Sequence, residues 1–220
     1  MDYKVRSVAV AIGVLALQSP LASAAVIFDQ TVDLTAGVFN SDFALPPQAT
    51  DDFQLQPGAS TISGIHWWGG YLSTPLAVDR FTIRIFADDA GAPAVNPLAQ
   101  FDVGHVGRID TGAEANNLDI YAYSVDITPL ALMADVTYWL SIVNDSTGSG
   151  GEHYWKWSTE PGEGNSQARA QDGQDWSEYN GKLGFRLTND ATEVAEPGTL
   201  ALLGLGLAGI GFQLRGRRTI

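Results

Sequence analysis

The sequence predicts an all-β domain between residues 25 and 193, folded as an antiparallel β-sandwich of the jelly-roll or immunoglobulin-like kind. Apolar and polar residues alternate with a period of two in several segments, and Gly, Pro, Asn and Asp separate these segments. No amphipathic helical pattern occurs between Ala25 and Glu193. One domain is expected, because about 170 residues are enough for a single buried core.

The clearest strands lie in the middle of the chain. Residues 81–86 and 121–127 alternate between two faces, which is typical of half-buried strands. The segment Val136 to Asn144 is apolar on both faces, so we predict that it is a central strand. Shorter strands are expected at residues 26–33, 52–56, 61–68, 98–103, 154–158 and 182–187. Loops are expected at residues 90–97, 145–152 and 160–174.

The N-terminal segment, residues 1–24, has the pattern of a secretory signal peptide. Lys4 and Arg6 precede an apolar stretch from Val8 to Leu17, and Pro20 ends it. Small residues then supply a cleavage site, at Ala22 and Ala24. We therefore expect that the chain is exported and cut after Ala24.

The C-terminal segment, residues 194–220, has three parts: a short box, an apolar run from Thr199 to Leu214, and a basic tail. The run of about 16 residues would span about 24 Å as a helix, slightly less than a bilayer core of about 30 Å. The arginines after the run would hold that end in the cytoplasm, which places the domain outside. The box is Ala195, Glu196, Pro197 and Gly198, and the tail contains Arg215, Arg217 and Arg218.

These C-terminal residues resemble the PEP-CTERM sorting signal, which consists of a Pro-Glu-Pro box, a hydrophobic helix and a basic tail. The resemblance covers residues 194–220 only, and Ala195 stands where the first proline of the box is expected. It implies that an exosortase recognises and cuts the chain. Exosortases are membrane-embedded cysteine transpeptidases of Gram-negative bacteria that make exopolysaccharide.

The chain is strongly acidic, with 25 Asp and Glu against 12 Lys and Arg. Five of the basic residues belong to the terminal segments, so the domain between them is more acidic still: Lys4, Arg6, Arg215, Arg217 and Arg218. Such a surface repels nucleic acid. The charge is typical of a soluble exported protein, and a divalent cation or a cationic matrix component is the functional alternative. The chain has no cysteine, which excludes disulfides and thiol chemistry.

No catalytic motif is recognisable. The sequence lacks a Gly-x-Ser-x-Gly elbow, and His66, His105 and His153 are widely spaced, without the local pairing that is typical of metal sites. We therefore predict that the protein is not an enzyme and carries no cofactor. A structural calcium is an alternative, since aspartates lie at predicted strand ends, with Asp88 and Asp89 the candidate ligands.

Six tryptophans in a domain of this size point to a third alternative, carbohydrate binding. An exposed indole ring can stack on the apolar face of a sugar. The candidate pairs are Trp68 with Tyr71 and Trp155 with Trp157. Large aromatic rings are also typical core residues, and Trp67 and Trp68 must point to opposite faces of a strand, so one of these two is predicted to be core.

Together these observations predict an exported, non-enzymatic cell-surface or extracellular-matrix protein that is sorted by exosortase and associated with exopolysaccharide. A carbohydrate-binding module and a secreted hydrolase are the alternatives. Signal peptidase and exosortase are the expected processing partners, polysaccharide is a candidate ligand, and no nucleic-acid partner is expected. The C-terminal helix would cross the inner membrane transiently, or tether the protein there if it is not processed.

Overall fold

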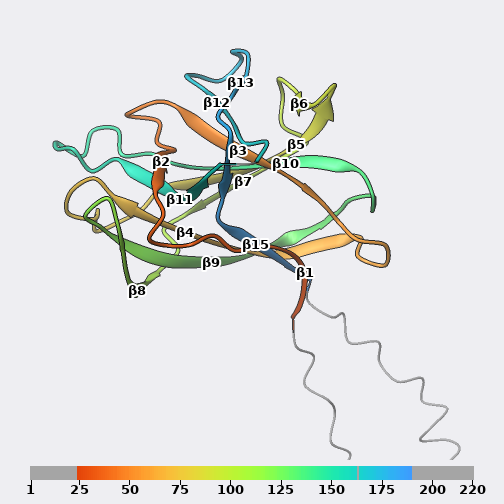
Figure 1. The fold of residues 1–220 in the computed structure, drawn as a ribbon, viewed down its shortest axis with the longest axis horizontal. Coiled ribbons are helices and arrows are strands. Elements are labelled where there is room, and N and C mark those ends of the chain that lie inside the picture. Colours follow the sequence, from red (N-terminus) through yellow and green to blue (C-terminus); the bar gives the residue numbers. More distant parts are fainter. Residues whose placement is uncertain (1–23, 163, 190–220) are drawn as a thin grey trace, which may run out of the picture.

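In the computed structural model, the chain forms two antiparallel, curled β-sheets that face each other, which is consistent with a β-sandwich (Figure 1). The structure describes residues 24–162 and 164–189. All of the regular secondary structure in these residues is β-strand, which confirms the all-β prediction. The narrower assignment, jelly-roll or immunoglobulin-like, stays a prediction.

The first sheet has eight strands arranged around β4, which pairs with β9 along one side and with β15 and β11 along the other. At the edge, β1 pairs with β15, and Ala25 lies opposite Asn189. The chain therefore enters and leaves the sandwich at the same edge. The strands are β1 (Ala25–Gln30), β2 (Val38–Asn40), β4 (Thr61–Tyr71), β8 (Arg108–Ala115), β9 (Leu118–Ala131), β11 (Trp155–Pro161), β14 (Gly181–Leu183) and β15 (Phe185–Asn189).

The second sheet has seven strands, and β10 lies between β3 and β5. Every residue of β10 after Thr137 is buried, which confirms the prediction of a central strand there. In Figure 1, β6, β12 and β13 lie at the top, on the side of the molecule away from β1 and β15. The strands are β3 (Gln48–Gln54), β5 (Phe81–Asp89), β6 (Ala92–Pro93), β7 (Ala99–Gly104), β10 (Thr137–Asn144), β12 (Gln167–Arg169) and β13 (Ser177–Glu178).

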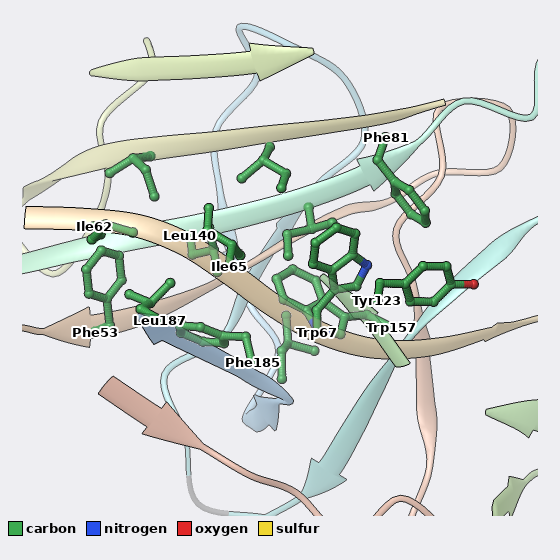
Figure 2. Close-up of a cluster of buried hydrophobic side chains, with 14 of the residues drawn as sticks. Phe53, Ile62, Ile65, Trp67, Phe81, Tyr123, Leu140, Trp157, Phe185 and Leu187 are labelled. Carbon is green, nitrogen blue, oxygen red and sulfur yellow. The ribbon is translucent and has the colours of Figure 1, made fainter. Parts of the chain in front are cut away.

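The core between the sheets is rich in aromatic rings (Figure 2). Trp67 stacks on Tyr123 with ring centroids 5.5 Å apart, and it meets Phe81 edge-on. Such pairs add about 0.5–1.5 kcal/mol each beyond their burial. A β-carbon at Gly69 would lie 2.5 Å from the ring of Trp155, so only glycine lets β4 and that indole approach so closely.

Two predicted loops contain short strands, and three strands lie outside every predicted segment: β2, β8 and β13. The segment 90–97 includes β6, and the segment 160–174 includes the end of β11 and all of β12. Residues 108–115 form β8, although they show no apolar alternation, because they pair with β9 at the edge of the first sheet. Residues 145–152 contain no strand, as predicted.

A buried carboxylate joins the two sheets. Asp51 of β3 points to the core side and is 1% exposed. One of its oxygens accepts hydrogen bonds of 2.6 Å from Gln30 Nε2 and from the backbone N–H of Leu183, which both belong to the first sheet. Burial is the main cause that raises the pKa of Asp51 from 3.8 to about 7, despite these hydrogen bonds.

The pKa of Asp51 predicts that the folded state loses stability as the pH rises through 7. The folded state binds the proton more tightly than the unfolded chain does, so the stabilisation is complete below pH 3.8 and disappears above the folded pKa of about 7. Between about pH 5 and about pH 8 the loss should be roughly 2–3 kcal/mol. Urea unfolding of the full chain across this range measures it.

The variant Asp51→Asn is the control, because it cannot ionise and still offers a carbonyl oxygen. His66 contributes with the opposite sign, since burial and then nearby Arg186 lower its pKa from 6.5. The difference between wild type and variant therefore isolates Asp51. Parallel pH profiles for the two proteins would contradict this assignment.

Candidate ligand-binding cleft

A polar cleft of about 320 Å³ lies on the outer face of the second sheet. Its floor is formed by Asp52 of β3 and by Thr137 and Trp139 of β10, which point away from the core because the core faces of these strands carry Phe53 and Leu140. Asp88 and Gly91 supply one wall at the turn between β5 and β6. The other wall comes from residues 164–167, Glu178 and Asn180.

The two walls of the cleft are held together by side chains that fold over the outer face of the sheet. Gln167 Nε2 donates a hydrogen bond of 3.0 Å to the carbonyl of Gly91, and Arg169 donates to the carbonyl of Val95. The guanidinium of Arg169 also lies 4.3 Å from the ring centroid of Trp176. These contacts place β12 beside the β5–β6 turn and fix the width of the cleft.

The carboxylates of the cleft differ in how they are bound. Asp88 is held by two donors, Trp139 Nε1 at 2.9 Å and the backbone N–H of Gly91 at 3.1 Å. Asp52 accepts one long hydrogen bond of 3.4 Å from Asn165 Nδ2. Glu178 is exposed and has no partner among the described residues. The cleft thus offers three carboxylates, and no Lys or Arg is among its described lining residues.

One buried hydroxyl of the lining lacks a partner among the described residues. Ser166 is 1% exposed, and its hydroxyl makes no hydrogen bond to any described residue. A buried hydroxyl without a partner costs about 1–3 kcal/mol. Such a group calls for an explanation, and Ser166 is among the residues that line the cleft.

Two arginines on the outer face of the second sheet, Arg84 and Arg169, are already paired with a carboxylate. Arg84 donates two hydrogen bonds to Asp172, at 2.7 and 3.2 Å, and Arg169 donates to the same carboxylate at 2.8 Å. Both guanidinium groups also donate to Gln48 Oε1. The paired cations therefore anchor the segment after β12 and are not free to bind a ligand.

A second cluster of ionisable groups lies beyond the end of β4. Asp79 is fully buried and accepts hydrogen bonds from the Tyr71 hydroxyl and from Arg108 Nη1, while His105 Nδ1 lies 3.3 Å from its other oxygen. Burial is the main cause that raises the pKa of Tyr71 far above 10, followed by the nearby Tyr123 and Asp79. The Tyr71 hydroxyl therefore stays a hydrogen-bond donor that ties β4 to the Asp79 segment.

The aromatic residues proposed from sequence as sugar platforms are mostly in the core. Trp155 and Trp157 are 0% exposed and Tyr71 is 2% exposed, so their rings have no free face for a sugar. The reason is strand alternation, which directs both tryptophans of β11 to the core side. Trp68 is half-buried, whereas Trp67 is fully buried, as expected for neighbours on opposite faces.

The calcium candidates are separated by the structure. Asp88 lines the cleft, whereas Asp89 is the exposed last residue of β5 and is not among the lining residues. Among residues 24–162 and 164–189, no three His, Cys, Asp or Glu side chains come together to hold a metal ion. The cleft instead combines Asp88 with Asp52, which lies within β3.

The predicted processing sites lie mostly outside the described residues. These are Ala22, Ala195, Glu196, Pro197, Gly198, Arg215, Arg217 and Arg218. Ala24 is described and exposed, one residue before β1. In the described part of the chain, no helix has the length and apolar character needed to cross a membrane.

Comparison with known protein families gives two matches. A family model described as a domain of unknown function (DUF7901) matches residues 26–197. A model of the PEP-CTERM protein-sorting motif matches residues 193–218. No curated protein and no solved structure matches the chain.

Proposed function

Because the chain belongs to the DUF7901 family and carries a PEP-CTERM sorting motif, we propose that it is a non-enzymatic surface or matrix protein that associates with extracellular polysaccharide. The motif implies export and exosortase-mediated sorting to the cell surface. Residues 194–220 of the sequence agree with it, apart from Ala195 in the box.

The polar cleft is the observation that carries the proposal. Its floor lies on the second sheet, whereas the chain enters and leaves the sandwich at the β1–β15 edge of the first (Figure 1). A protein held through its C-terminal segment therefore presents the cleft on the side away from that edge. Clefts lined by carboxylates, amides and hydroxyls fit polyhydroxylated ligands, because such groups hydrogen-bond sugar hydroxyls.

The described lining residues of the cleft do not form the nucleophile–base pair of a serine hydrolase. No histidine is among its described lining residues, and the Ser166 hydroxyl has no base within hydrogen-bond distance. A serine nucleophile needs such a base. Asp88 already accepts hydrogen bonds on both oxygens, from Trp139 and Gly91, so the turn holds it in a structural position.

Fractionation of the source organism tests the proposal. The protein is expected to stay with the extracellular polymer through salt washes, and to appear in the medium when polysaccharide synthesis is deleted. An unchanged distribution in the two strains would show that the protein does not depend on the polymer.

A further inference from the structure

We propose that the cleft binds an amino sugar of the extracellular polysaccharide through its free ammonium group, an inference that rests on the proposed function. The observation that carries it is the charge of the cleft. Three carboxylates, Asp52, Asp88 and Glu178, line it without any Lys or Arg among its described lining residues. The whole chain has a net charge of -13, so its field adds to the attraction for a cation.

A compact metal ion fits this arrangement poorly. The three carboxylates come from β3, from the end of β5 and from β13, and they belong to no group of three that could hold a metal within the described residues. An ammonium group needs fewer carboxylates than a metal ion does, because a single carboxylate can accept a charge-assisted hydrogen bond from it. Glu178, which is exposed and unpaired, is the most available of the three.

The remaining groups of the cleft fit the hydroxyls of a sugar ring. Ser166 has a buried hydroxyl without a partner, which can both donate to and accept from a ligand hydroxyl. Thr137, Asn165 and Asn180 line the same space with further donors and acceptors. The volume of about 320 Å³ lies at the lower end of the range for small-ligand sites, as expected for one or two sugar units.

Calorimetric titration of the full chain, purified in a detergent without a sugar headgroup, tests this inference. The probes are a short glucosamine oligosaccharide and its fully N-acetylated counterpart of equal length, both with a chelator present. We expect the glucosamine probe to bind at least about tenfold more tightly. Its affinity should fall with added salt, because salt screens the ion pair.

Two variants locate the site. Glu178→Gln should weaken binding of the glucosamine probe at least about fivefold. The matched control is Glu114→Gln, which removes the same charge from an exposed position on β8 of the other sheet and should leave affinity unchanged. Ser166→Ala should weaken binding of the glucosamine probe about fivefold without lowering the melting temperature, because the lost hydroxyl has no partner in the protein.

Three results would overturn the inference: equal affinity for the two probes, binding of the glucosamine probe only when calcium replaces the chelator, or equal effects of Glu178→Gln and Glu114→Gln. These results can be distinguished from a failure of the proposed function, which is association with the polysaccharide. If neither probe binds but the protein still stays with the polymer in cells, the cleft is not the contact and polysaccharide association stands. If the protein also leaves the polymer, both proposals fail.

Discussion

Replacing Asp42 with alanine is expected to lower the free energy of unfolding by at least about 4 kcal/mol, a large part of the stability of a domain of this size. Asp42 is fully buried between β2 and β3 and has no basic partner in the described part of the chain. Its carboxylate accepts five hydrogen bonds, from the backbone N–H groups of Ala44, Ser146 and Trp155 and from the side chains of Asn144 and Ser146. Alanine would leave these buried donors without an acceptor.

Urea unfolding of the full chain measures this loss. Asp42→Asn gives a second value if the alanine variant does not fold, because it keeps one acceptor oxygen and should lose less. Glu114→Ala is the surface control and should change stability by no more than about 0.5 kcal/mol. An alanine variant at Asp42 that is as stable as this control would show that the five hydrogen bonds contribute nothing net.

Replacing Trp155 with alanine is expected to cost about 3–5 kcal/mol of stability, because the ring is 0% exposed at the centre of the aromatic core. It meets Phe81 and Tyr123 edge-on, with centroids 5.1 and 6.3 Å away, and lies 6.1 Å from Trp157. A cavity at this position cannot close easily, since strands of both sheets surround it.

This variant separates the two interpretations that the sequence allowed for the tryptophans. If Trp155 is a core residue, the variant should lose stability, and its affinity for oligosaccharide should be unchanged at temperatures where it is folded. If Trp155 is a sugar platform, the variant should lose affinity for oligosaccharide, and its stability should be unchanged. Trp155→Phe is the matched control, because it keeps a ring in the core and should lose less stability than alanine.

The strands with apolar alternation could be predicted from sequence, because burial of one face leaves a direct pattern. The segments 81–86 and 121–127 lie in β5 and β9, and Val136 to Asn144 matches β10 apart from its first residue. Strand β8 could not be predicted in this way. Its sequence, Arg-Ile-Asp-Thr-Gly-Ala-Glu-Ala, is mostly exposed, and pairing with β9 defines it.

The cleft could not be predicted, because its residues are distant in sequence and only the sheet pairing brings them together. Asp52 meets Thr137 and Trp139 through the β3–β10 register, and β12 reaches the site by pairing with β3. One signal did exist. A strand that is apolar on both faces, as at Val136 to Asn144, requires a cover on its outer side, and Trp139 lies under that cover beside the cleft.

The central claim is that the chain is exported and cut in its sorting motif, so that the sandwich works outside the cell. The most direct test is the intact mass and location of the protein in the source organism with and without its exosortase gene. We expect a surface or extracellular species that starts near Ala25 and ends near Glu196, and that disappears without the enzyme. The same uncut C-terminal segment in both strains would contradict the claim and would show that Ala195 has inactivated the box.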